Sequence, residues 1–319
     1  MSRTLIGVDV CKDFLDAHAR PTGACQRFDN NPEGVARLVA WVRPLGPERV
    51  VFESTGPYQK AAVGALLAEG LPAVVVNARQ VRDFAKAMNY LAKTDTIDAA
   101  VIAHFGEVAS TTVRPLESQE IRDLREFYDR RGQLVRMLAM EKNQRHSASI
   151  AQASARVLKS IDKHIDYLEG QIQDLEQRMD KIIDSSAAFQ ARNALLQTIT
   201  GIGPQVSRTL LAYLPELGQY NRQTIAALVG LAPFNDDSGT HTGQRHIRGG
   251  RSKVRRGLYQ AAVAAIRHCP HMKEFYASLK ARGKASRVAL VAVARKLLVL
   301  ANALIRDMVA YKAPANSVC

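Results

Sequence analysis

Short apolar segments alternate with helix patterns over the first 115 residues, and this alternation limits the fold more than any other feature. Asn31 and Pro32 open one helix pattern as a cap and a first helical residue, and Gly70 ends the next. Five segments of strand character lie around these helices: 4–10, 13–19, 25–30, 49–54 and 72–77. Strands that alternate with helices predict an α/β sheet.

The middle of the chain, 116–190, predicts long helices. Between 157 and 183 the apolar residues recur at alternating spacings of four and three, which is an a/d heptad seam. Its members are Ile161, Ile165, Leu168, Ile172, Leu175, Met179 and Ile182. The seam either packs on the chain's own domain or joins two protomers as a coiled coil. Because charged residues surround it, we favour the coiled coil between protomers.

The last segment, 191–319, predicts an all-α domain. Two apolar-faced helices over 193–215 meet at Gly201 and Gly203, which fits a helix–hairpin–helix element that binds nucleic-acid phosphates. An ordinary pair of helices joined by a glycine turn is the alternative. We therefore divide the chain into three domains, 1–115, 116–190 and 191–319.

Positive charge is concentrated in the last of these domains. The chain has a net charge of +14, and 191–319 carries 19 Lys and Arg against 5 Asp and Glu. The counts are 13 against 12 in 1–115 and 12 against 13 in 116–190. A solvated surface normally mixes both signs, whereas Lys and Arg gathered on one domain replace the counterions of phosphates. We therefore predict a nucleic-acid partner, with an anionic membrane or an acidic protein as the alternatives.

The sequence does not predict a membrane span or a secretory signal. The long apolar segment 286–309 is interrupted by four basic residues, Arg287, Arg295, Lys296 and Arg306. The N-terminus enters a strand pattern directly, unlike a signal peptide. The cysteines form no CxxC pair, which favours a reducing cytosol over a zinc site or a disulfide framework; they are Cys11, Cys25, Cys269 and Cys319. We expect a cytoplasmic, nucleoid-associated protein of a bacterial type of cell.

Four acids stand where solvation alone does not explain them. Asp9 interrupts an apolar strand, and Glu53 ends another. Asp95 and Asp98 lie three apart at a helix start, so they share one helical face. A carboxylate in a buried strand is costly unless it is paired or binds a metal. Together the four acids predict a Mg²⁺ site, with Mn²⁺ as the alternative ion, of the kind that two-metal nucleases use.

These acids also have structural interpretations. Asp95 could cap its helix or stabilise the helix dipole, and Glu53 could pair with a basic residue. Asp13 and Asp16 are alternative ligands, although they occupy more exposed or turn-like positions.

Ser238 stands at the edge of a basic stretch. It is either part of a solvated loop or a hydroxyl held beside a phosphodiester. We expect the Lys and Arg residues that follow to hold phosphates: Arg245, Arg248, Arg251, Lys253, Arg255 and Arg256. Ser252 is a rival nucleophile, and His241 is a rival general base that could instead contact phosphate or solvent.

Five motifs in order give the chain a family resemblance. They are GVDVCKD (7–13), FESTG (52–56), AKTDTIDAA (92–100), GIGP (201–204) and GLAPFNDDSG (230–239). In this order they resemble the DEDD-type transposases of the insertion-sequence one-hundred-and-ten family, which are related to the Piv DNA invertase. The resemblance covers nearly the whole chain. The Ser-Thr-Gly after Glu53 is a mild departure, since relatives can carry Ala-Thr-Gly.

The resemblance implies a fold and a chemistry. The fold is a RuvC-like ribonuclease-H-fold domain, a helical coiled-coil middle and a helical transposase domain. The metal ligands would be Asp9, Glu53, Asp95 and Asp98, and Ser238 would be the nucleophile that forms a phosphoserine–DNA intermediate. Family members are recombinases guided by a bridge RNA that pairs with target and donor DNA. The family also favours a site shared between protomers, so we expect a homodimer that pairs into a tetramer.

Two other functions use fewer of these features. A RuvC-like nuclease that hydrolyses DNA junctions or RNA needs only the carboxylates, with water as its nucleophile. A non-catalytic nucleic-acid scaffold needs only the basic surface. The first leaves Ser238 unexplained, and the second leaves the four acids unexplained.

Overall fold

The fold is that of a computed structural model, which divides into two compact units, Met1–Glu117 and Ser118–Cys319. It describes residues 3–54, 56–90, 95–109, 118–235, 237–238, 241–243 and 245–311. For 95–97, 237–238 and 241–242 it describes the backbone alone.

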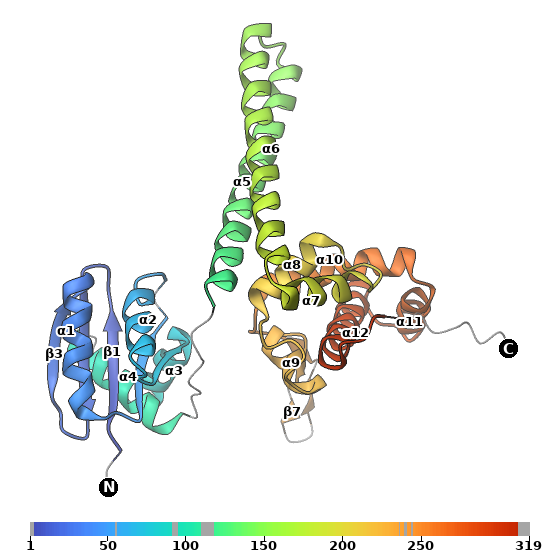
Figure 1. Ribbon diagram of the computed structural model, residues 1–319. Helices are drawn as coiled ribbons and strands as arrows, with labels where there is room; N and C mark the ends of the chain where they lie inside the picture. Colours follow the sequence, from blue (N-terminus) through green and yellow to red (C-terminus); the bar gives the residue numbers. More distant parts are fainter. Residues whose placement is uncertain are drawn as a thin grey trace. The chain divides into compact units, whose positions relative to one another are not determined.

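The first unit is built on one mixed sheet of five strands, in the order β3-β2-β1-β4-β5 (Figure 1). The three strands β1, β2 and β3 are antiparallel neighbours, and β4 and β5 run parallel to β1. All five predicted strands are confirmed, as β1 (Leu5–Val10), β2 (Phe14–Arg20), β3 (Cys25–Asp29), β4 (Arg49–Glu53) and β5 (Ala73–Val76).

Helices cover both faces of this sheet. One face carries α1 (Pro32–Val42) and α2 (Lys60–Ala68), whose apolar residues form a core with Val8, Leu15 and Phe28. The other face packs Val51 and Val74 against two further helices, α3 (Ala78–Ala87) and α4 (Asp95–Val108). A 3₁₀ turn, η1 (Arg43–Leu45), follows α1. The predicted cap of α1 is confirmed, because Asn31 Oδ1 accepts a hydrogen bond of 2.8 Å from Gly34 N.

Gly7 allows α4 to lie directly on β1. A Cβ atom on Gly7 would stand 2.2 Å from the Ala99 carbonyl oxygen and 2.3 Å from the Ala103 amide nitrogen. Gly106 of α4 has the same role against β4, because a Cβ on Gly106 would meet Val51 Cγ2 at 2.5 Å. These close approaches fix the position of α4, and with it the position of Asp98.

Gly7→Ala is expected to destabilise the first unit by about 3 kcal/mol, because the added methyl group forces the α4 backbone away from the sheet. Urea unfolding followed by circular dichroism measures this change. Gly64→Ala in α2 is the matched control, since its Cβ meets nothing within 4 Å. The control should be neutral or more stable by up to about 1 kcal/mol. Equal stability of the two variants would contradict the tight packing of α4.

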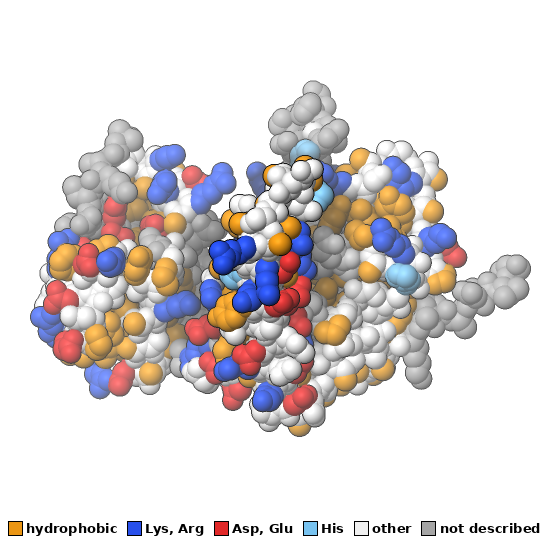
Figure 2. All heavy atoms as spheres, turned by 90° about the horizontal axis from the view of Figure 1, so that it is seen from above, with side chains coloured by type: hydrophobic (Ala, Val, Ile, Leu, Met, Phe, Trp, Pro, Cys, Tyr) orange, Lys and Arg blue, Asp and Glu red, His pale blue; other side chains and the backbone are white. Residues whose placement is uncertain are grey.

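A long helical hairpin opens the second unit. Its arms are α5 (Gln119–Ile150) and α6 (Ala155–Asp184), linked across by ion pairs between Arg131 and Glu176 at 2.6 Å and between Arg145 and Asp162 at 2.7 Å. Figure 2 looks along the hairpin from its end, where acidic and basic side chains are interspersed.

The heptad seam of α6 therefore packs on the chain's own α5, which is the first of its two interpretations. Leu168 in the seam is buried, and Ile161, Ile165 and Ile172 remain half-buried. A coiled coil between protomers stays a prediction.

The remaining helices share one apolar core with the base of the hairpin. Leu124 of α5 and Met179 of α6 belong to the same buried cluster as Leu211, Leu258 and Leu297. The helices are α7 (Ala187–Gln197), α8 (Pro204–Tyr213), α9 (Arg222–Val229), α10 (Ser252–His268), α11 (Pro270–Ala281) and α12 (Ser286–Asp307). The predicted domain boundary at 190 stays a prediction.

Helix α12 is long and apolar enough to cross a membrane by length and composition alone. In the structure it is a core helix, since Val293, Leu297 and Ala301 are fully buried in the cluster described above. Of its basic residues, Arg287 is exposed, and Arg295 and Lys296 are half-buried.

Candidate active site

Two of the predicted metal ligands lie side by side at the carboxyl ends of two parallel strands. Strands β1 and β4 pair in register up to Val8 and Phe52, and the next residues are Asp9 and Glu53. Side chains alternate between the two faces of a strand, so Asp9 lies on the same face as Gly7. Glu53 likewise lies on the face of Val51, which packs in the core beneath α4. Both acids therefore face the α4 side of the sheet.

The direction of α4 brings a third acid to the same end. Arg49 begins β4, and its Nη1 donates to the carbonyl oxygens of Gly106 and Ala109 at 3.4 and 3.3 Å. The C-terminal end of α4 thus lies at the amino ends of the strands. Its N-terminal turn, with Asp98 beside the Ala99 that packs on Gly7, lies at their carboxyl ends. Asp95 is the first residue of this helix, and its side chain is outside the described residues.

The carboxylates at this end of the sheet are chemically suited to bind a hard divalent cation. Asp9, Glu53 and Asp98 are all partly buried carboxylates, and oxygen is the ligand that Mg²⁺ prefers. Asp9 Oδ1 accepts from Val10 N at 3.0 Å, which helps to hold the carboxylate at the strand end. Among the described side chains, which exclude that of Asp95, no group of three or more His, Cys, Asp and Glu is arranged to hold a metal ion.

The acid across from Asp9 has a different role. Asp16 pairs with Asp9 in the β1–β2 register, and its carboxylate accepts two hydrogen bonds from Arg27, at 2.7 and 2.9 Å. Farther along β2, His18 Nδ1 lies 3.1 Å from Cys25 Sγ. Burial, and to a lesser extent the charge of Arg20, lower the pKa of His18, so its ring is neutral at neutral pH. The sequence analysis did not predict the Asp16–Arg27 and His18–Cys25 contacts, because only the register between β2 and β3 brings these residues together.

Ser238 lies on a β-hairpin. Strands β6 (Pro233–Phe234) and β9 (His246–Ile247) form its base, and β7 (Asp237–Ser238) pairs with β8 (His241–Thr242) farther out. In the outer pair Ser238 is directly opposite His241. Opposite residues of an antiparallel pair have Cβ atoms about 4.5–5.5 Å apart on one face, so the register makes His241 a neighbour of Ser238. The side chains of both residues are outside the described ones.

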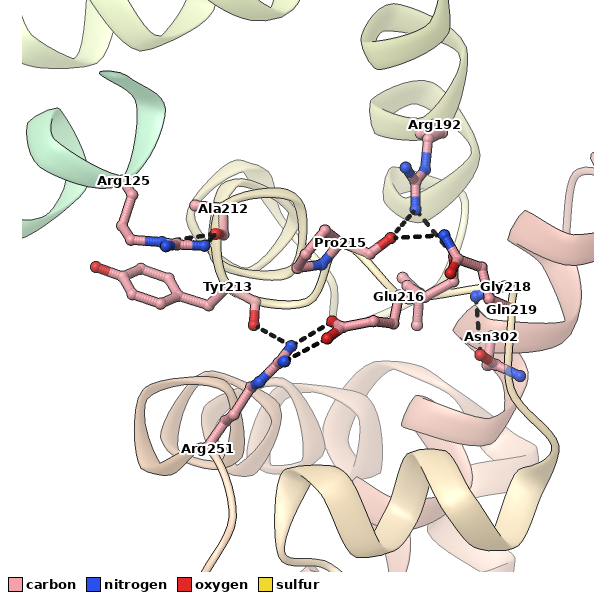
Figure 3. A network of polar contacts seen from close by, with 11 residues as sticks. Arg125, Arg192, Ala212, Tyr213, Pro215, Glu216, Gly218, Gln219, Arg251 and Asn302 are labelled. Atoms are coloured by element: carbon pink, nitrogen blue, oxygen red, sulfur yellow. Dashed lines mark hydrogen bonds and ion pairs between the residues drawn. The ribbon is translucent and has the colours of Figure 1, made fainter. Parts of the chain in front are cut away.

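Three of the basic residues predicted to hold phosphates are bound within the protein. Arg251 donates to both carboxylate oxygens of Glu216, each at 2.5 Å, and to the Tyr213 carbonyl oxygen at 2.8 Å (Figure 3). Lys253 pairs with Asp129, and Arg255 donates to backbone carbonyl groups of Val229 and Gly249. These contacts hold the start of α10 to the neighbouring helices and loops.

The Tyr213 hydroxyl joins the contact between Lys253 and Asp129. It donates to Asp129 and receives a hydrogen bond of 2.9 Å from Lys253 Nζ. Burial first, and then the hydrogen bond and charge of Asp129, raise the pKa of Tyr213 far above its ordinary value. The phenol is therefore a neutral structural donor and not a base.

The other basic residues of the set are exposed. Arg245 and Arg248 lie on the second half of the hairpin, and the Arg248 guanidinium lies over the Phe234 ring at 5.1 Å. Arg256 lines a hollow of about 530 Å³ between α5, α8 and α10, together with Arg136. Arg245, Arg248 and Arg256 are more exposed than Arg251 and Lys253, which favours their contact with phosphates.

Arg251→Ala is expected to lower the free energy of unfolding of the second unit by about 2–3 kcal/mol, because the Glu216 side chain is only 14% exposed and loses its bidentate partner. The exposed Arg248→Ala should change it by less than about 1 kcal/mol and should weaken nucleic-acid binding instead. Urea unfolding and binding titrations at two salt concentrations separate these effects. Equal stability losses would remove the distinction between the two arginines.

The two glycines of the predicted helix–hairpin–helix element differ in their surroundings. Gly201 has φ +101°, and a Cβ there would stand 2.5 Å from the Ala261 carbonyl oxygen, so close packing against α10 accounts for this glycine. Gly203 is the N-cap of α8, and a Cβ there would meet nothing within 4 Å. Of the two, Gly203 has the open backbone that a phosphate contact needs.

Comparison with known proteins gives the family. A profile of DEDD transposases of the IS110 type, described as transposase, matches residues 6–153. A second, described as the transposase IS116/IS110/IS902 family, matches residues 193–277. The chain belongs to the IS110 transposase family. The two matches together include all four acids and Ser238.

Curated relatives extend this likeness along the chain. The pilin gene-inverting proteins of Moraxella bovis and Moraxella lacunata are each 26% identical in an alignment 318 residues long that covers 96% of this chain and 97% of theirs. A putative transposase, y4rJ, of Sinorhizobium fredii is 31% identical over 160 residues, 46% of this chain and 40% of that protein. The family makes this chain a DNA-acting enzyme of the transposase and recombinase class.

Proposed function

We propose that this IS110-family enzyme cleaves and rejoins DNA strands with Ser238 as its nucleophile and an acidic metal site at the carboxyl ends of β1 and β4. The observation that carries the proposal is the placement of Asp9, Glu53 and Asp98 at one end of the sheet, on the face that α4 covers. Three separate segments of the chain supply these acids. Neither solubility nor helix capping requires acids from three segments to lie at the same end of the sheet, whereas a metal site does.

The order and directions of the strands support a ribonuclease-H-like fold for the first unit. Three antiparallel strands followed by two that run parallel to the first give the order β3-β2-β1-β4-β5. Asp9, Glu53, Asp95 and Asp98 would hold Mg²⁺ or Mn²⁺. Such an ion, when bound, supplies positive charge that stabilises the charge developing on the reacting phosphate.

The covalent step conserves the phosphodiester energy. The Ser238 Oγ forms a bond to phosphorus, the bond from phosphorus to the departing strand's oxygen breaks, and that oxygen finally takes the serine's proton. In the reverse direction, the hydroxyl of another strand attacks the phosphoserine and releases Ser238. A serine hydroxyl needs a proton acceptor, and His241, which is opposite Ser238 in the strand register, is the histidine to test.

The proposed partners are target and donor DNA, a structured guide RNA and further copies of the chain. If base pairing with the guide selects the DNA, the protein needs contacts to backbone and shape, for which Arg245, Arg248 and Arg256 are exposed. The residues of α6 that stay half-buried, Ile161, Ile165 and Ile172, support a dimer that pairs into a tetramer, with acids and serine contributed by different protomers.

A covalent-trapping assay tests the proposal. The full-length protein is incubated with Mg²⁺, RNA transcribed from the flank of its element and labelled target DNA, and the products are separated on a denaturing gel. We expect a protein–DNA adduct that requires the divalent cation. Cleaved DNA without an adduct would mean that water attacks the phosphate, and the chain would then act as a metal-dependent nuclease.

A further inference from the structure

The α4 side of the sheet has an open edge beside the candidate metal ligands. Strand β3 is an edge strand of the sheet, and a hollow of about 380 Å³ is lined by Asp16, His18, Cys25, Arg27 and Ala99, with Ala17 and Gln26. It adjoins the acids from two sides, because Asp16 pairs with Asp9 in the β1–β2 register and Ala99 follows Asp98 in α4. Its volume lies in the roughly 300–1,000 Å³ range of small-ligand pockets.

Arg27 is held in a fixed orientation at this edge. Its guanidinium donates to both oxygens of Asp16 and lies over the Phe14 ring, with Cζ 5.1 Å from the ring centroid. Phe14 and Asp16 are two residues apart on β2 and share its α4-side face with Arg27 on β3. The Arg27 side chain is 50% exposed and Phe14 is 39% exposed, so neither is enclosed by the core.

The charges of this edge favour a flat, uncharged ligand group over a phosphate. The carboxylate of Asp16 largely offsets the charge of Arg27, and His18 Nδ1 lies within hydrogen-bonding distance of Cys25 Sγ. What Arg27 and Phe14 offer to a ligand is a planar surface. Nucleobases stack on aromatic rings and on guanidinium planes.

We propose that Arg27, supported by Phe14 and held by Asp16, is a stacking platform for one unpaired nucleobase of the strand whose phosphate lies at the carboxylates. This inference rests on the proposed cleavage site, to which it adds a contact that positions the strand. A stacked base next to the reacting phosphate fixes the strand without reading its sequence, because every base has a flat face.

Single-stranded oligonucleotides with one 2-aminopurine, as DNA and as RNA of the same sequence, test the platform with the full-length protein. Stacking should quench the 2-aminopurine fluorescence in the wild type. Phe14→Leu keeps an apolar side chain but removes the ring, so it should restore the fluorescence and weaken binding by about tenfold. Arg27→Ala should do the same, and Phe14→Tyr should keep wild-type behaviour. Tyr167→Ala, at a 60% exposed aromatic residue of α6, is the matched control and should change nothing.

Quenching with the DNA oligonucleotide supports the inference, and quenching with RNA alone or with neither oligonucleotide would overturn it. A phosphate contact at Arg27 has a different signature. In that case Arg27→Ala would reduce the slope of log affinity against log salt by about 0.7, and Phe14→Leu would bind like the wild type. This outcome would also overturn the platform. The readout is independent of the covalent adduct, so an adduct without a Phe14 effect would leave the proposed function in place.

Discussion

Ser238→Ala is expected to abolish the protein–DNA adduct and to reduce strand exchange by about 10³-fold or more. Loss of the nucleophile in serine enzymes costs up to about 10⁶ in rate, because binding and charge stabilisation alone remain. The change removes a single oxygen atom from a residue in the outer strand pair of a hairpin, so the variant should keep its fold. The measurement is the trapping assay described above, with circular dichroism as the check on folding.

The matched control is Ser252→Ala. Ser252 is the first residue of α10 in the same basic stretch, and its side chain is exposed. This variant should retain the adduct. Loss of the adduct in Ser252→Ala but not in Ser238→Ala would move the nucleophile to α10. His241→Gln adds a second readout: if the imidazole accepts the serine's proton, the variant should form adduct more slowly, and the slower rate should recover as pH rises.

The sequence identified the strands and the long helices because their signals are local. Apolar runs bounded by turn residues gave β1, β4 and β5, and the heptad seam gave α6. The register between strands is not local. The position of Glu53 beside Asp9 depends on pairing between segments more than 40 residues apart, and Gly7 is needed only because α4 returns to cover β1. Asp9, Glu53 and Asp98 could be chosen from the sequence, but their position at the same end of the sheet could not.

The basic stretch shows what a local signal leaves out. Its Lys and Arg residues look alike in sequence, yet Arg251 meets Glu216, 35 residues away, and Lys253 meets Asp129, 124 residues away. A count of charge cannot reveal such partners. The hairpin at Ser238 was missed because its strands are two residues long, which is too short for an alternating pattern.

Asp9→Asn and Glu53→Gln are expected to lower DNA cleavage by at least about 100-fold while leaving the fold intact. Each change removes one negative ligand at the carboxyl ends of β1 and β4 and keeps the shape of the side chain.

Metal binding gives a readout that does not depend on activity. A ligand at 100 times its dissociation constant stabilises the folded state by about 2.7 kcal/mol, so Mg²⁺ or Mn²⁺ should raise the melting temperature of the wild type. The rise should be much smaller in Asp9→Asn and Glu53→Gln. Asp13→Asn is the matched control, since this exposed acid lies in the β1–β2 turn and should keep both cleavage and the thermal shift. If Asp9→Asn and Glu53→Gln keep cleavage and the thermal shift as Asp13→Asn does, the acids at the strand ends are structural, and the chain must cleave DNA at another site.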